Sequence, residues 1–337
     1  MDNADKNLMF NININNNKGV INMNNLKKIG LTALGTALVS SSAFAGSLDV
    51  TGTAGITYVG NSATDNGDNK LEQKTTISFT GSADLDNGFT VSYYNNVSGS
   101  AMTAGNQHFD VDMGDMGKLR FAGAGTSGNG AVGAWDDKTP AANEESWDIK
   151  GGGGETGPVS QQKTNDSFIY TNSSMVDGVT VVLNYKPGET TYDSTTGAGI
   201  AFTGVEGLNV GAAMEDNNTT DGAVVENTVF YATYAMDAFT IGFQANESDS
   251  QTANSDTEFE AWGVSYAVSE DISISYGSST VEYESGASKS DQEADAIGIS
   301  WTNGSMSVTA SRHDIANVAG TSTDDRDVTE VNLTFAF

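Results

Sequence analysis

The chain ends in the stretch VNLTFAF (Val331–Phe337), in which large apolar residues alternate with smaller or polar ones up to the last residue. Because successive side chains of a β-strand point to opposite faces, this alternation predicts a strand with one apolar and one polar face. The same period of two begins upstream at Ser47–Val59 and continues in Phe89, Val91 and Tyr93. The sequence therefore predicts an all-β protein.

Sixteen such segments follow one another between Ser47 and Phe337. Tight turns, such as Asp86-Asn87-Gly88 and Asn303-Gly304, follow the even-numbered segments, and longer, mostly acidic links follow the odd-numbered ones. Asn and Gly suit tight hairpin turns because they accept positive φ. Short turns at one end and long loops at the other are typical of outer-membrane barrels. We therefore predict a 16-stranded antiparallel transmembrane β-barrel.

The predicted strands centre on short apolar runs, such as Phe239–Phe243 and Ile272–Tyr276, and Val97–Asn106 is predicted to be a link. An exported adhesin or a β-solenoid is the alternative interpretation of this composition. A solenoid requires a fixed internal repeat, and the sequence shows none. The barrel is therefore the favoured prediction.

Composition excludes several classes of function. The 337-residue chain has 44 acidic and 15 basic residues and a formal net charge of −29, so we expect no nucleic-acid partner. It contains no Cys, which excludes disulfides and Cys-based metal sites. Its two histidines, His108 and His313, have no nucleophile motif beside them, and His313-Asp314 is the one candidate pair. We predict that the protein is not an enzyme.

The N-terminus carries export signals. Residues 23–45 read as a signal peptide, with the basic pair Lys27-Lys28, the short apolar run Ile29–Val39 and the cleavage motif Ala43-Phe44-Ala45. Residues 1–22 are Asn-rich, and we interpret them as a non-native extension before Met23; a long n-region is the alternative. Residues 46–337 then form the barrel.

The alternation stops between Ala124 and Asn165, which form the third long link. This stretch contains four consecutive glycines at 151–154, two acidic pairs and the tryptophans Trp135 and Trp147. Loops of this length without secondary structure are uncommon and are usually functional or disordered. We predict that this loop folds into the barrel and narrows it.

Three stretches resemble a known family. The terminal Phe337, the run Gly114–Gly123 (GDMGKLRFAG), and Ser167–Thr171 followed by Asp177-Gly178-Val179 stand in the order and spacing found in porins. The chain resembles the trimeric general porins of Gram-negative outer membranes, particularly the alphaproteobacterial type, over essentially its whole mature length. The resemblance implies a homotrimer, an inward-folded third loop facing a ladder of basic side chains, and recognition of Phe337 by the barrel assembly machinery.

The chain departs from the family pattern near this loop. Met116 stands where porins usually have an aromatic residue, and Ala124 where a basic residue often follows. By parity, Ile169 occupies the place of an inward Arg. We therefore expect an acidic loop that faces only a thin basic ladder.

The residues predicted to form the pore constriction come from this loop and from the strands near it. They are Asp136, Asp137, Glu144, Glu145 and Asp148 in the loop, and Lys74, His108, Lys118 and Arg120 on strand faces that point inward by parity, as Asp110 and Asp112 also do. Charged rings set the ion preference of a water-filled pore, so the acidic excess predicts cation selectivity. The loop carboxylates could instead be ordinary solvated charges.

Further acids fall on the outer links: Asp65, Asp68, Glu215, Asp216, Asp249, Asp256, Glu282, Glu284, Asp324, Asp325 and Asp327. Carboxylate oxygens suit hard cations, so these acids could be bridged to lipopolysaccharide by divalent ions, or bind Ca²⁺; we expect no other cofactor. Aromatic residues near strand ends could form membrane-interface girdles: Tyr58, Tyr94, Tyr185, Tyr266, Tyr276, Trp301 and Phe337.

Together these patterns predict an outer-membrane porin that passes small hydrophilic solutes and ions by diffusion. Two alternatives stay open. One is a substrate-specific channel in which Trp135 and Trp147 help to bind the solute. The other is a non-conducting adhesin or structural barrel.

Overall fold

The computed structural model describes residues 46–61, 70–99, 101–123, 130–149, 157–158, 165–188, 193–218, 224–284 and 287–337. The predicted N-terminal extension (1–22) and signal peptide (23–45) lie outside the described residues. Within the part described, no helix has the length and hydrophobicity needed to cross a membrane.

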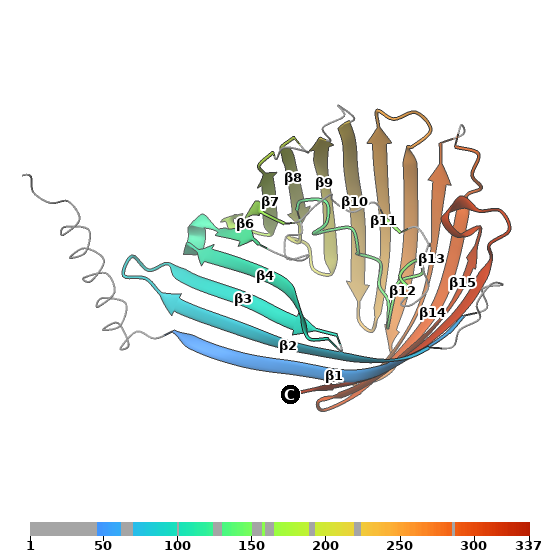
Figure 1. Ribbon diagram of the computed structural model, residues 1–337, viewed down its shortest axis with the longest axis horizontal. Helices are drawn as coiled ribbons and strands as arrows, with labels where there is room; N and C mark the ends of the chain where they lie inside the picture. The colour runs from blue at the N-terminus through green and yellow to red at the C-terminus, as the bar shows by residue number, and fades with distance from the viewer. Residues whose placement is uncertain are drawn as a thin grey trace, which may run out of the picture. The chain divides into compact units, whose positions relative to one another are not determined.

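The strands form one closed barrel in which each pairs antiparallel with its neighbours in sequence and β1 pairs with β16 (Figure 1). They are β1 (Ser47–Asn61), β2 (Lys70–Asp84), β3 (Thr90–Ser98), β4 (Thr103–Asp112), β5 (Lys118–Ala122), β6 (Ser167–Val176), β7 (Val179–Lys186), β8 (Thr195–Phe202), β9 (Leu208–Asn218), β10 (Val224–Met236), β11 (Phe239–Ser250), β12 (Thr257–Ala267), β13 (Ile272–Tyr283), β14 (Gln292–Asn303), β15 (Met306–Ala316) and β16 (Arg326–Ala336), with short 3-10 turns at Gly114–Met116 and Val318–Gly320. The predicted 16-stranded barrel is confirmed.

The tight turns gather at one end of the barrel, as predicted. Asp177-Gly178 joins β6 to β7 and Gly304-Ser305 joins β14 to β15. Gly178 has φ 71° and Gly304 has φ 60°, a region that residues with a Cβ enter only at a cost. The longer links therefore share the opposite end of the barrel.

The C-terminal stretch closes the barrel. Tyr58 of β1 pairs with Val331 of β16. At the end of the ladder, Gly52 donates its backbone N–H to the Phe337 carbonyl (2.7 Å), and Phe337 donates to the Gly52 carbonyl (2.9 Å). A Cβ at Gly52 would lie 2.7 Å from the Phe337 ring, so glycine leaves room for the terminal aromatic side chain.

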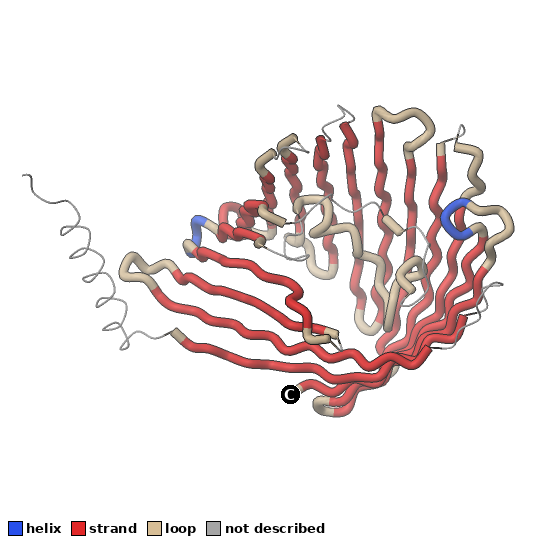
Figure 2. Tube along the Cα trace, viewed as in Figure 1, coloured by secondary structure: helices blue, strands red, loops and turns tan. Residues whose placement is uncertain are grey.

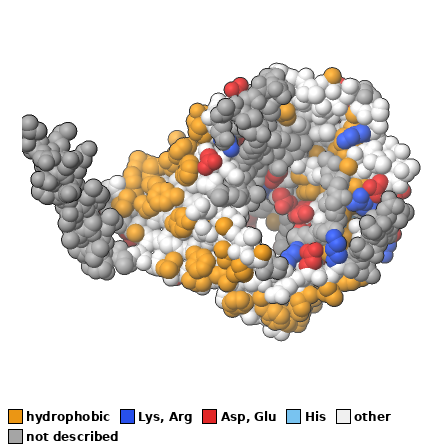
Figure 3. Space-filling model, in the orientation of Figure 1, with side chains coloured by type: hydrophobic (Ala, Val, Ile, Leu, Met, Phe, Trp, Pro, Cys, Tyr) orange, Lys and Arg blue, Asp and Glu red, His pale blue; other side chains and the backbone are white. Residues whose placement is uncertain are grey.

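Large apolar side chains point outward along the strands. Phe79, Phe109, Phe230 and Ile241 are all more than a third exposed. Figure 3 shows hydrophobic side chains over the outer wall and charged ones around the hollow. This arrangement is the reverse of a soluble core, as expected where lipid covers the outside and water fills the inside.

The strands extend further than their apolar runs predict. β11 continues to Ser250 and β13 to Tyr283. Toward the long-loop end both faces carry polar residues, so the alternation fades while the backbone pairing continues. The predicted link Val97–Asn106 is wrong for the same reason, since β4 begins at Thr103 and only residues 99–102 connect it to β3.

Candidate functional site at the barrel constriction

The loop between β5 and β6 is called here the inner loop (residues 123–166), and its described stretch 130–149 runs along the inside of the barrel (Figure 2). Its Ala131 N–H donates to Asn184 Oδ1 of β7 (2.7 Å), and its Ala142 N–H donates to Ser275 Oγ of β13 (2.7 Å). Asn184 and Ser275 face the lumen. The predicted inward fold of this loop is therefore confirmed.

Gln244 of β11 supports the middle of the inner loop. Its Oε1 accepts a hydrogen bond from the Lys138 N–H (2.8 Å), and its Nε2 donates to the Asp136 carbonyl (2.6 Å). The Gln244 side chain is fully buried. A single wall residue thus satisfies one backbone donor and one backbone acceptor of a loop without regular structure, as buried peptide groups require.

His313 of β15 supports the far end of the loop. Its Nδ1 lies 3.2 Å from the Ser146 carbonyl, and Ser146 Oγ donates to Ser279 Oγ (2.8 Å). The His313 ring is buried, whereas Asp314 points to the outer face and is exposed. His313 and Asp314 therefore lie on opposite faces of the wall and do not form a catalytic pair.

Two glycines of the wall let the loop approach closely. A Cβ at Gly199 of β8 would lie 2.2 Å from the Trp135 ring, and one at Gly263 of β12 would lie 2.8 Å from the Pro140 carbonyl oxygen. Both distances are far below van der Waals contact. The position of the inner loop therefore depends on glycine, which has no side chain, at these two wall positions.

The two tryptophans anchor the loop to the wall. Trp135 packs on Tyr231 of β10 with ring centroids 6.1 Å apart, and Trp147 meets Phe259 of β12 edge-on at 4.9 Å. Each Trp side chain is 7% exposed. Both rings therefore lie against the wall, and the alternative in which Trp135 and Trp147 help to bind a solute stays a prediction.

The five predicted loop acids lie on the inner loop between β5 and β6. Asp137 and Asp148 are exposed, and Asp136, Glu144 and Glu145 are half-buried. Burial, with a further contribution from the Asp137 charge, raises the pKa of Asp136 to about 7 and that of Glu145 to about 8. These carboxyls therefore change charge near neutral pH.

Asp148 lies within electrostatic reach of two wall residues, His313 of β15 and Lys74 of β2. Partial desolvation of its carboxyl, followed by the Asp137 charge, raises the pKa of Asp148, while the charges of His313 and Lys74 act in the other direction. Lys74 belongs to β2 and is exposed to the lumen. Of the four predicted basic residues, Lys74 is the one that acts on the pKa of Asp148.

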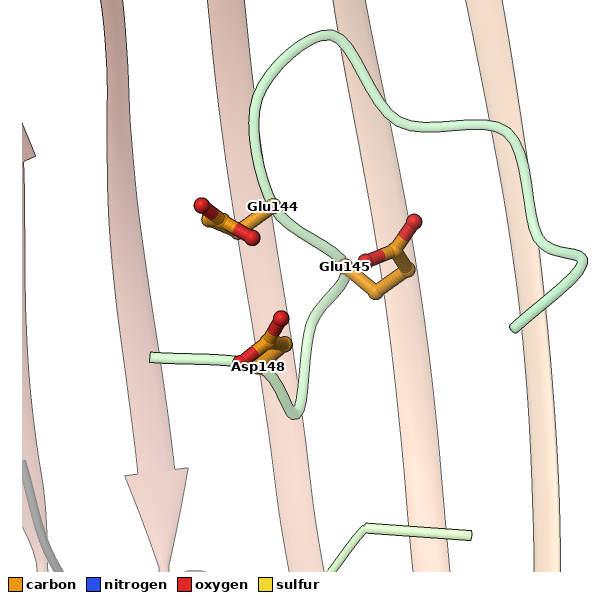
Figure 4. A group of neighbouring side chains, drawn as sticks. All are labelled: Glu144, Glu145 and Asp148. Carbon is orange, nitrogen blue, oxygen red and sulfur yellow. The ribbon is translucent and has the colours of Figure 1, made fainter. Parts of the chain in front are cut away.

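Glu144, Glu145 and Asp148 could hold a metal ion (Figure 4). One oxygen from each lies within 4.8 Å of the other two. Oxygen ligands at this spacing suit a hard cation, although Ca²⁺ takes six to eight ligands. Ca²⁺ binding by the acidic loops stays a prediction.

The other predicted cations gather around an acid of β4. Arg120 of β5 contacts Asp110 through two hydrogen bonds, Nε to Oδ1 (2.7 Å) and Nη2 to Oδ2 (2.9 Å). Lys118 Nζ and His108 Nε2 each lie 3.8 Å from Asp110 Oδ2. Asp110 was absent from the predicted constriction set, although the turn at 114–117 places it opposite Arg120 in the hairpin register.

A cavity of about 490 Å³ lies between this cluster and the start of the inner loop. His108, Lys118 and Arg120 of β4 and β5 line it together with Ile169 of β6 and Val182 of β7, and Trp135 lines it from the inner loop. Ile169 is the cross-strand neighbour of Arg120, so the cationic and apolar parts of the wall adjoin. We call it the Lys118 pocket. Tyr94 also lines it and stacks on His108 at 4.9 Å, so the prediction that Tyr94 belongs to a membrane girdle is wrong.

Glu215 was predicted to lie on an outer link, and this prediction is wrong. It points inward from β9 under the inner loop and is 3% exposed. Asp216, one residue later, faces outward by the alternation of the strand and bonds Thr196 of β8 (2.6 Å). Asp65 and Asp68 lie outside the described residues.

The comparisons with known proteins agree with this geometry. The family model described as Gram-negative porin matches residues 30–302. The structure is similar to Salmonella typhi OmpF in complex with daunomycin (TM-score 0.71, 15% identity, 87% of this chain and 98% of the other). It is also similar to the trimer form of Vibrio cholerae OmpT (TM-score 0.65, 13% identity, 87% and 100%) and to a mutant of the Rh. blastica porin (TM-score 0.62, 14% identity, 86% and 100%).

No curated protein matches the chain. At these identities the structural matches establish the fold alone. The family match covers most of the chain, including β1 to β13 and the whole inner loop. The chain therefore belongs to the Gram-negative porins, β-barrels of the outer membrane.

Proposed function

We propose that the barrel lets small hydrophilic solutes and ions diffuse across the outer membrane and favours cations. The observation that carries the ion preference is the acidic group on the inner loop. Asp137 and Asp148 are exposed to the lumen there, and Lys74 is the cation that acts on Asp148. Fixed charges lining a narrow pore raise the local concentration of the oppositely charged ion.

The basic cluster offsets little of this negative charge. Arg120 is held in a two-bond contact by Asp110, which also lies near Lys118. The cluster therefore has a net charge close to +1, whereas the inner loop carries six acids against Lys138 among its described residues. The charge difference supports a negative potential in the constriction.

Planar-bilayer recordings test both parts of the proposal. The purified, folded protein should produce stepwise conductance in KCl, and the reversal potential across a KCl gradient should show a preference for K⁺. A folded barrel that fails to conduct would favour the non-conducting structural or adhesin alternative. A preference for Cl⁻ would overturn the proposed ion selectivity while leaving the pore intact.

We also propose a homotrimer, as the chain is similar to a barrel solved in a trimer form. Among the described strand residues, the outward positions of β1 to β8 carry no charge, which suits a buried subunit contact. The outward positions of β9 to β16 carry Arg312 and a series of acids: Asp216, Glu226, Glu247, Asp249, Glu258, Glu260, Glu282, Glu293, Asp295, Asp314 and Asp327.

This acidic half of the wall supports contact with lipid and lipopolysaccharide through divalent cations. An unboiled gel tests the trimer, because a heat-sensitive high-mass band is expected and a monomer by light scattering would contradict it. Assembly through the barrel assembly machinery is proposed from the terminal Phe337, whose ring lies at the closure of β1 and β16.

A further inference from the structure

The Lys118 pocket has an apolar side, which is unusual in a barrel lumen. Ile169 of β6 and Val182 of β7 are 6% and 5% exposed, and the Trp135 side chain packs beside them. Lumen-facing residues of porin barrels are mostly polar. Ile169 stands where the resemblance to porins predicts an inward Arg, so this apolar surface replaces part of a basic ladder.

The part of the pocket wall next to this apolar surface is cationic. Asp110 binds the Arg120 guanidinium through two short hydrogen bonds, whereas Lys118 Nζ is 3.8 Å from the nearer Asp110 oxygen. The Lys118 side chain is 42% exposed. Its ammonium group therefore keeps donors directed at water. Asp112, the cross-strand partner of Lys118, does not line the pocket, so among the lining cations and Asp110 one positive charge remains.

The remaining lining is polar and the size suits a small solute. Thr171, which is the cross-strand neighbour of Lys118 and of Val182, and Thr180 complete the lining. His108 Nδ1 is buried without a hydrogen-bond partner in the described part of the chain. The volume of about 490 Å³ falls within the usual range for small-molecule sites, about 300–1,000 Å³.

We infer that the Lys118 pocket binds small organic carboxylates that carry a compact apolar body, with the carboxylate at Lys118 Nζ and the body against Ile169 and Val182. The inference rests on the proposed pore, through which the solute reaches the pocket. It does not conflict with a preference for inorganic cations, because that preference comes from the whole lumen whereas the pocket has a local charge near +1. A bound carboxylate stays at the constriction and interrupts ion flow.

Three probes separate the contribution of the carboxylate charge to binding from that of the apolar body: benzoate, acetate and neutral benzamide. Each is added to single channels in KCl, and the concentration that halves the current is measured. Benzoate should block roughly tenfold more tightly than acetate, the gain expected when about half of a phenyl ring leaves water. Benzamide, which lacks the charge, should block roughly fivefold more weakly than benzoate, as for one partly screened ion pair.

Two variants and one control variant test whether benzoate blocks the channel from the Lys118 pocket. Lys118→Gln should weaken benzoate block roughly fivefold without changing block by benzamide. Ile169→Thr should weaken both aromatic probes and leave acetate unchanged. Lys70→Gln removes a cation at an inward position of β2 outside the pocket, and it should leave benzoate block unaltered.

Isothermal titration calorimetry on the detergent-folded barrel measures benzoate binding without requiring conductance. A barrel that binds benzoate but passes no current would refute the pore and leave the pocket standing. A conducting barrel in which benzoate acts no more strongly than acetate would refute the pocket, as would equal weakening by Lys118→Gln and Lys70→Gln. A heat-sensitive gel band confirms that each variant is folded.

Discussion

Lowering the pH from about 9 to about 6 should reduce the cation preference of the pore, because two inner-loop carboxyls lose their charge in this interval. The pKa of Asp136 is raised to about 7 and that of Glu145 to about 8. A carboxyl with a raised pKa is neutral below that pKa and anionic above it. At about pH 6, roughly nine-tenths of the Asp136 groups and nearly all of the Glu145 groups are protonated.

The expected change in the K⁺/Cl⁻ permeability ratio follows from the loss of the Asp136 and Glu145 charges. At roughly 8 Å in water, one charge changes the energy of a permeating monovalent ion by about 0.5 kcal/mol. Screening with a Debye length of about 10 Å at 0.1 M salt halves this value. Two charges then favour K⁺ and disfavour Cl⁻ by about 0.5 kcal/mol each, so the K⁺/Cl⁻ permeability ratio should fall roughly fivefold.

The assay is the reversal potential across a KCl gradient at each pH, with EDTA present so that divalent ions do not compete with protons. The matched control combines Asp136→Asn, Glu145→Gln and Asp148→Asn with Glu215→Gln, which removes the inner-loop carboxyls whose pKa is raised and the buried carboxyl of Glu215 beneath them. Its permeability ratio should resemble that of the parent at low pH and vary little with pH. A parent ratio that is constant across the range, or an equal pH response in the control, would refute the reasoning.

Gly199→Val should displace Trp135 from the wall, since a Cβ would lie 2.2 Å from its ring; red-shifted Trp fluorescence and altered conductance report this. Gly81→Ala, where a Cβ would make only an ordinary contact with the Ser47 carbonyl oxygen at 3.9 Å, should change neither. Gln244→Leu should lower the free energy of unfolding by about 1–3 kcal/mol, because it leaves two buried backbone groups of the inner loop unpaired; unchanged denaturation in urea would contradict this. Phe337→Ser should reduce the amount of folded barrel in outer-membrane fractions, and normal levels would argue against a role of the terminal residue in assembly.

Much of the barrel follows from local patterns in the sequence. The number and order of the strands, the tight turns and the inward parity of Lys118 and Arg120 can be read from the period of two and from Gly, Asn and Asp in the turns. These features depend on neighbouring residues. The strand ends are less predictable, as at Ser250 and Tyr283, because polar residues occupy both faces above the apolar band and remove the pattern.

The position of the inner loop could be predicted only in part. Its length, composition and place between the fifth and sixth strands indicated an inward fold, but its path along the wall depends on residues far away in sequence. In the sequence, nothing distinguishes the wall residues that support the loop from other lumen-facing polar residues. These supporting residues are Asn184, Gln244 and Ser275. No period in the loop specifies which wall strand each part contacts.

The sequence by itself determined a sixteen-stranded barrel with an acidic third loop, because strand alternation and turn chemistry are local. The contact of Asp110 with Arg120 is also local, because it follows from the β4–β5 hairpin register. Only the tertiary structure decided that Glu145 is buried enough for its pKa to reach about 8, and that Trp135 of the inner loop encloses a cavity with Lys118 and Ile169. Both depend on the path of the inner loop, which packs against wall residues far away in the sequence. The charge of the constriction therefore follows from packing as well as from composition.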